Sequence, residues 1–456
     1  MTKDLTKGSP FRVIVGYLTP VFFSLLLQSL YSVTDAAIVG QTLGADALGG
    51  ISATGNLNAV TLGFCTGLNA GFCIPIANAF GAGDHGRLRR LFANAAYLCC
   101  GAAAVMVLVA APLTTPLLTA MKTAPENFPY AVSYLRIIFL GAPFSLAYNL
   151  CGGVIRSLGD SKMPTVFLAA SAVTNVVMDL VLIVIFRMGT AGAALATVCS
   201  QLIAFLGCFL YILKKVPVLH AARREWRPDC RLLGTLLRNG VPMALQSVLI
   251  SFGPLVQRPA LNSLGAETVN ALAVSGRINS ILMCPLSTIG HSIGYYYGQN
   301  TGAGRPDRIR QGFRVGVTLS AVFCLLSTLL VYFFAAPLTA LFLQTPEPEL
   351  VENVRLALLI VNGASFFCGL CSTYRPAVQA MGYAFLSLVP CFVEVGLQIF
   401  GALVLIPAFG FVGANLSTAA AWLAVACAVV PMGYRCLDKL CIRLSAYSPS
   451  SKEEPL

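Results

Sequence analysis

The stretch LGADALGGISA at residues 43–53 returns as LGAETVNALAV at residues 264–274, 221 residues further along the chain. A spacing that recurs across most of a sequence is the signature of an internal repeat. The sequence therefore predicts two homologous halves. Two further pairs keep the same spacing without a gap: GAG at residues 81–83 and 302–304, and GTAGAALAT at residues 189–197 with GFVGANLST at residues 410–418.

Composition places both halves in a membrane. Of the 456 residues 57% are hydrophobic and 11% are charged, and the mean hydropathy is +0.78, which leaves too little polar surface to cover a soluble protein. The first apolar run is longer than a cleavable signal, so it is interpreted as a span. Twelve runs are long enough to cross about 30 Å of hydrocarbon. They are residues 12–40, 51–79, 91–120, 131–155, 163–187, 190–213, 236–262, 271–299, 313–343, 354–380, 384–407 and 411–434.

Six spans in each half determine how the halves are related. Because six is even, both halves enter and leave the membrane on the same side, which is the parallel repeat of many secondary transporters. We therefore expect an all-α membrane protein with two homologous six-helix lobes. The expected divisions are an N-lobe over residues 1–215, a cytoplasmic linker over residues 216–234, a C-lobe over residues 235–437 and a cytoplasmic tail over residues 438–456.

Basic residues predict the orientation. If both termini are cytoplasmic, 23 of the 30 Lys and Arg fall in the tails and loops on that side, and four fall on the other: Lys122, Arg136, Arg187 and Arg355. The positive-inside rule favours this orientation and accounts for the net charge of +12. A nucleic-acid-binding protein would gather its charge on one soluble domain, and none is expected here.

Cysteine and glycine motifs give no sign of a cofactor. Cys368 and Cys371 form a CxxC within an apolar run, but the chain has three histidines and no second CxxC to complete a metal site. Gly81, Gly83 and Gly86 spell GxGxxG after a membrane span rather than a strand, which argues against a dinucleotide site. No convincing pairing of a nucleophile with a base is present, so an enzyme is not expected.

Polar residues recur at helical spacing inside several apolar runs. Asp35 and Asp179 are carboxylates deep in such runs, where a charge is expensive unless the protein uses it. Their polar neighbours share a helix face with them, at intervals of three, four or seven residues. These faces are Gln28, Tyr31 and Asp35; Ser171, Asn175 and Asp179; and Thr197 with Gln201.

Taken together, these features resemble the multidrug and toxic compound extrusion (MATE) transporters, with NorM-like and DinF-like members. The resemblance covers nearly the whole chain: twelve spans, the doubled GAG followed by arginines, glycines at 159 and 382 after the fourth and tenth spans, and a Gly-x-x-Gly-Ala opening of the sixth and twelfth. It implies two lobes that form a V around a central cavity. It also implies an N-lobe cation site of Asp35, Asn175, Asp179 and Thr197.

Two coupling ions are compatible with that set. Carboxylate, amide and hydroxyl oxygens suit Na⁺, in which case the four residues would be its metal ligands. Two buried carboxyls would suit H⁺ equally. A purely structural role, in which the acids only tie helices together by hydrogen bonds, is the remaining alternative.

The C-lobe departs from the N-lobe. Val256 stands at the position that matches Asp35, so a C-lobe cation site is not expected. Glu394 lies in the eleventh span and could pair with an arginine or contact cargo. The expected lining of the substrate cavity is Gln28, Tyr31, Gln201, Arg258, Arg277 and Glu394.

The function expected from this sequence is a monomeric antiporter in a bacterial cytoplasmic membrane. It would exchange H⁺ or Na⁺ for amphipathic, cationic organic compounds by alternating access, with membrane lipids as its other partners. The alternative is a flippase for a lipid-linked saccharide or similar cargo. Arg258 and Arg277 favour that alternative, whereas the buried aspartates and the count of twelve spans oppose it.

Overall fold

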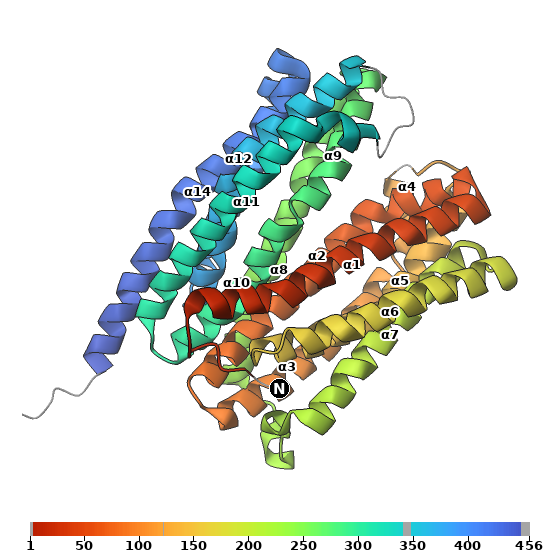
Figure 1. Cartoon of the computed structure of the whole chain (residues 1–456). Coiled ribbons are helices and arrows are strands. Elements are labelled where there is room, and N and C mark those ends of the chain that lie inside the picture. The colour runs from red at the N-terminus through yellow and green to blue at the C-terminus, as the bar shows by residue number, and fades with distance from the viewer. Residues whose placement is uncertain (1–2, 122, 341–347, 448–456) are drawn as a thin grey trace, which may run out of the picture. The chain divides into compact units, whose positions relative to one another are not determined.

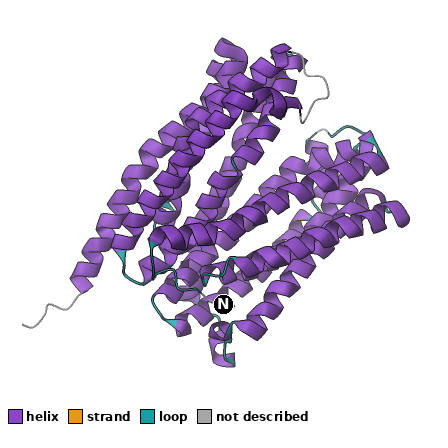
Figure 2. Cartoon of the chain, in the orientation of Figure 1, coloured by secondary structure: helices purple, strands orange, loops and turns teal. Residues whose placement is uncertain are grey.

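The computed structural model describes residues 3–121, 123–340 and 348–447, and all regular structure in these ranges is helical (Figure 2). Helices suit such apolar sequences because each backbone N–H and C=O is satisfied within its own segment, without water. The chain divides into two compact units. The first unit holds Lys3, Gly16–Ala77 and Asp84–Phe252, and the second holds Asp4–Val15, Asn78–Gly83 and the chain from Gly253 onward.

In the first unit α7 packs against both α5 and α6 (Figure 1). This arrangement allows side chains from three helices to meet in one place. The helices from the N-terminus to the middle of the chain are α1 (Pro10–Leu43), α2 (Ala45–Gly81), α3 (His85–Val105), η1 (Met106–Ala110), α4 (Thr114–Ala120), α5 (Phe128–Ser157), α6 (Lys162–Asp179), η2 (Leu180–Ile185), α7 (Gly189–Lys215), η3 (Pro217–Leu219), η4 (Arg223–Trp226) and α8 (Cys230–Asn262).

In the second unit α12 packs against α10, α11 and α14 (Figure 1). The elements η1, η2 and η6 are π-helical, and η3, η4 and η5 are 3₁₀-helical. The remaining helices are α9 (Ala266–Leu282), α10 (Cys284–Gly302), α11 (Pro306–Ala340), α12 (Pro348–Ala380), η5 (Leu386–Leu388), α13 (Val389–Phe400), η6 (Gly401–Leu405) and α14 (Ile406–Tyr447).

Ten helices in the described ranges are long and apolar enough to cross a membrane, and the count is eleven if the bent pair Ala271–Leu282 and Cys284–Gly302, at 42°, is taken as one span. One of the ten, Leu386–Ser445, is 60 residues long, whereas a span needs about 20. Gly410 interrupts it with a non-helical backbone, φ 54° and ψ −128°. Divided there, it supplies the predicted eleventh and twelfth spans.

The predicted third span is too long at its C-terminal end. The sequence suggested one run over residues 91–120, but the membrane-compatible helix ends at Ala110 and a separate short helix, α4, follows. Pro112 stands in the intervening turn, where its missing N–H interrupts the helical hydrogen bonds.

Two equivalent glycines let the ends of α2 and α10 approach closely within the second unit. A Cβ on Gly81 would lie 2.0 Å from the Gln299 carbonyl oxygen, and one on Gly302 would lie 1.9 Å from that of Asn78. Two residues later, Gly83 and Gly304 adopt φ of 72° and 64°, which ends each helix in the left-handed region. The GAG repeat therefore marks a backbone-to-backbone crossing.

Arg308, one of the basic residues counted toward the orientation, is buried rather than exposed. Its guanidinium donates to Asn300 Oδ1 at 3.0 Å, to the Gly8 carbonyl at 2.9 Å and to the Leu5 carbonyl at 3.2 Å. Gln299 Oε1 accepts from the Leu5 amide at 2.8 Å. The segment before α1 is thus held by α10 and α11.

Candidate functional site

Two carboxylates from distant parts of the sequence meet in the first unit. Asp35 lies half-buried in α1, and Asp179, the last residue of α6, is fully buried. Their carboxyl groups lie close enough to interact electrostatically. When both are ionised they repel each other, so the pair favours a proton or a metal cation between or upon them.

The backbone changes its winding directly after Asp179. Helix α6 passes into the π-helical segment η2 at Leu180. The same change occurs in the second unit, where α13 passes into η6 at Gly401, 221 residues later. Because π turns recur at both positions, the winding belongs to the repeated fold. Only the first unit has a carboxylate at this point, since Phe400 stands where the repeat places Asp179.

Asn175 lies one turn before Asp179 on the same buried face of α6. Only 1% of it is exposed, and neither its amide nitrogen nor its amide oxygen has a hydrogen-bond partner in the described chain. This face is joined to α7 by a hydrogen bond from Ser171 Oγ to the Ser200 carbonyl, at 2.7 Å. Within α7, Ser200 Oγ donates to the Thr197 carbonyl at 2.8 Å.

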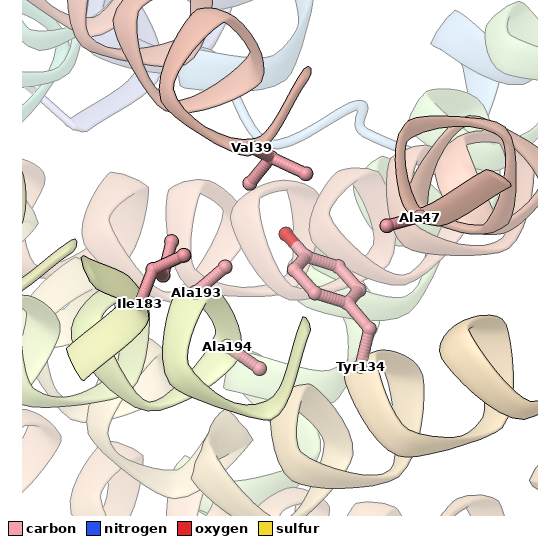
Figure 3. Close-up of a cluster of buried hydrophobic side chains, with 6 residues drawn as sticks. All are labelled: Val39, Ala47, Tyr134, Ile183, Ala193 and Ala194. Atoms are coloured by element: carbon pink, nitrogen blue, oxygen red, sulfur yellow. The ribbon is translucent and has the colours of Figure 1, made fainter. Parts of the chain in front are cut away.

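Thr197 on α7 is linked to a tyrosine that the sequence did not single out. Its hydroxyl donates to the Ala193 carbonyl at 3.1 Å, and its side chain lies near the hydroxyl of Tyr134 from α5. Figure 3 shows that hydroxyl pointing into the buried cluster that includes Val39 and Ala193. Tyr134 is also close enough to interact electrostatically with both aspartates, so it belongs to the candidate site.

Buried polar atoms without partners mark the centre of this site. Besides both polar atoms of Asn175, they include Asp35 Oδ1 and both carboxylate oxygens of Asp179. Such atoms are costly to bury unless something bonds to them. The described chain has no group of three His, Cys, Asp or Glu side chains placed to hold a metal ion, so a bound cation would also need amide and hydroxyl oxygens. That donor set fits Na⁺, and the acid pair fits H⁺.

The cavity residues expected in the first unit lie at different positions relative to the acid pair and differ in how buried they are. Tyr31 is half-buried, lies near the exposed side chain of Gln28, and interacts electrostatically with Asp35. Gln201 lies half-buried one turn beyond Thr197 on α7. Gln28, Tyr31 and Asp35 therefore lie along one face of α1.

In the second unit Glu394 pairs with an arginine. Arg375 Nη2 lies 3.4 Å from Glu394 Oε2, and the two side chains are 12% and 11% exposed. This is the first of the two roles expected for Glu394. Arg258 and Arg277 are exposed, and neither forms an ion pair with another described residue.

Comparison with known proteins gives one consistent result. A family model described as MatE matches the chain twice, at residues 20–181 and 242–404. The Bacillus subtilis (strain 168) protein named "Probable multidrug resistance protein YoeA" is 30% identical over 76% of this chain and 76% of its own length. A Shewanella oneidensis protein named "FAD transporter" is 24% identical over 81% and 82% of the respective chains. The solved structure of an outward-facing multidrug resistance MATE transporter superposes with a TM-score of 0.90 at 19% identity, over 97% of this chain and 99% of the other.

Proposed function

We propose that this chain, which belongs to the multidrug and toxic compound extrusion (MATE) family of membrane transporters, exports amphipathic, cationic organic compounds in exchange for H⁺ or Na⁺. The observation that carries the proposal is the buried pair of Asp35 and Asp179 beside the unpartnered amide of Asn175. Two acids with three buried oxygens that lack hydrogen-bond partners are poorly explained as structural ties, because a tie would satisfy those oxygens.

Coupling follows from charge at the pair. A cation that binds Asp35 and Asp179 removes their repulsion, with Asn175 and Thr197 supplying further oxygens if the cation is Na⁺. The ion can shift the transporter only by the difference between its affinities for the two conformations. The membrane potential adds about 2.3 kcal/mol per elementary charge for each 100 mV.

The proposed setting is the bacterial cytoplasmic membrane, with both termini in the cytoplasm and one chain as the working unit. The transporter would need no cofactor. The N-lobe, linker, C-lobe and tail are proposed to divide at residues 215, 234 and 437. The support for this orientation is the distribution of Lys and Arg along the chain.

The test is transport by the purified protein in liposomes. A pH gradient without Na⁺, and a Na⁺ gradient at uniform pH, are imposed in turn while a fluorescent lipophilic cation is followed. We expect one of the two gradients to drive uphill movement of the dye, and Asp35→Asn to abolish it. Dye movement that ignores both gradients would contradict ion coupling.

One observation favours a second cargo class. Arg258 and Arg277 are exposed cations of the second unit that form no ion pair with a described residue, and one relative is named for transport of FAD, an anionic molecule. An anionic or lipid-linked saccharide cargo would use such arginines. The same liposomes distinguish the two, because flipping of a labelled lipid-linked sugar without dye efflux would favour the second.

A further inference from the structure

The segment between α7 and α8, residues 214–231, carries a dense group of exposed cations and is called here the basic segment. It contains the short helices η3 and η4. Because it joins two membrane-compatible helices over so few residues, it must lie at a membrane surface, whichever side that is. Its exposed cations are Lys214, Lys215, Arg223, Arg224, Arg227 and Arg231.

The two acids of the basic segment do not neutralise these cations. Both carboxylate oxygens of Glu225 accept from Arg89 Nε, at 2.7 and 2.8 Å, and one of them also accepts from the Ala222 amide at 2.8 Å. The hydrogen bond from Arg89 lowers the pKa of Glu225, so this pair remains ionised at neutral pH. Asp229 accepts from the Arg231 amide at 2.9 Å at the start of α8.

The basic segment is also fixed in place by contacts with α3. Tyr97 donates its hydroxyl to the Trp226 carbonyl at 2.6 Å, and the Trp226 ring packs edge-on against Phe92 and Tyr97, with centroids 6.5 and 6.2 Å away. Asn94 Oδ1 accepts from the Asp229 amide at 3.0 Å. A solvated charged loop would lack such contacts. Fixing the backbone in advance lowers the entropy lost when a ligand binds.

We propose that the basic segment is a preformed binding surface for the headgroups of anionic phospholipids. Guanidinium groups match phosphate oxygens in a bidentate geometry, and Arg223, Arg224 and Arg227 present three of them around one tryptophan. Trp226 is 39% exposed, and tryptophan favours the headgroup level of a bilayer. Leu210 and Leu213, just before on α7, are exposed and apolar, as contact with acyl chains requires.

The experiment uses Trp226 as the reporter. The chain has two tryptophans, so Trp422→Phe leaves Trp226 as the only one. This protein is placed in nanodiscs of phosphatidylcholine that contain an equal, small fraction of either doxyl-labelled phosphatidylglycerol or doxyl-labelled phosphatidylcholine. We expect the anionic quencher to be enriched at Trp226 and to quench it several-fold more strongly.

Two triple variants distinguish specific binding of lipid at the basic segment from attraction by the net charge of the protein. Arg223→Gln/Arg224→Gln/Arg227→Gln should abolish the preference for the anionic quencher, because each basic residue near an anionic leaflet changes association by about fivefold. Arg310→Gln/Arg314→Gln/Arg435→Gln removes the same charge from exposed positions elsewhere and should retain the preference. The emission maximum of Trp226 reports whether its packing on α3 survives. If the emission maximum changes in the first triple variant, the three single variants are measured instead. Each of them should lose part of the preference for the anionic quencher.

Three outcomes would overturn the proposal. The first is equal quenching by the two lipids in the parent protein. The second is a preference that persists without Arg223, Arg224 and Arg227. The third is an equal loss in both triple variants, which would show that net charge alone attracts the lipid.

Discussion

A carboxylate that carries a coupling ion must bind a cation and release it in every cycle, and an amide of the same size cannot do so. We therefore expect Asp35→Asn and Asp179→Asn to fold and reach the membrane in normal amount, because each removes a charge while nearly preserving volume. Both should lose ion-driven uphill efflux. Asn175→Ala and Thr197→Ala delete single oxygens and should weaken apparent ion affinity more mildly, by about tenfold or less. Efflux at graded ion concentrations in liposomes measures both effects. Uphill transport by Asp35→Asn at the native rate would place the ion elsewhere.

Tyr134 should matter through its hydroxyl. Tyr134→Phe keeps the ring in the cluster of Figure 3 and removes the hydroxyl that lies near Thr197 and the two aspartates. One polar group of this kind contributes about 1 kcal/mol, so apparent ion affinity should fall by about fivefold. Tyr130→Phe, one turn earlier on α5 and 38% exposed, is the matched control and should behave as the parent. Equal ion affinities in the two variants would remove Tyr134 from the site. Thermal unfolding in detergent checks that both remain folded.

The acids can be found in the sequence because a charge in an apolar run stands out, whereas Tyr134 cannot. A tyrosine in a membrane helix has an apolar ring that suits its surroundings, and its hydroxyl comes near the polar residues of α7 only when α5 packs against α7. Arg308 shows the reverse case. Its sequence position indicates a basic loop, but only the folded chain shows that it is buried against the segment before α1.

At the scale of elements, the repeat predicts more than the local sequence does. The matching GAG sequences become two helix ends with left-handed glycines, and both halves change to π winding at positions 221 residues apart. Local patterns alone cannot predict the π segments, because LVLIVI and GALVL are equally compatible with an ordinary α-helix. The interruption at Pro112 and the 42° bend before α10 are likewise set by packing and proline.

The crossing of α2 and α10 should be sensitive to a single methyl group. Gly81→Ala forces a Cβ against the Gln299 backbone, and overpacking of this kind costs about 1–3 kcal/mol. Gly83→Ala has free space but is strained by its positive φ, at about 1–2 kcal/mol. Both should lower the unfolding temperature and expression without changing ion preference. Gly101→Ala, with no neighbour within 4 Å in α3, is the control and should be neutral or stabilising. Normal abundance with a switched ion preference in Gly83→Ala would contradict this structural role.

At the scale of the whole molecule, the internal repeat is visible in the sequence, and the double match of one family model agrees with it. All-helical membrane architecture follows from hydropathy, because only helices or closed barrels satisfy the backbone in lipid. The sequence also shows one difference between the two halves, which is that the second half lacks the candidate ion ligands. At the positions that match Asp35, Asn175 and Asp179 it has Val256, Gly396 and Phe400. The sequence leaves open whether Glu394 pairs with an arginine or contacts cargo, because the Arg375–Glu394 contact joins α12 to α13 in space.

This asymmetry predicts that ion coupling depends on the first unit alone. Glu394→Gln should leave the ion dependence of efflux intact and alter only stability or cargo affinity. The single variant leaves Arg375 buried without its partner, which can cost about 3–5 kcal/mol, so protein yield should fall. Arg375→Gln/Glu394→Gln removes both charges together and should restore part of that stability. Efflux per folded molecule is then measured against ion concentration for the double variant and its parent. An unchanged half-saturating ion concentration is the expected result, whereas loss of ion dependence would place a coupling site at Glu394.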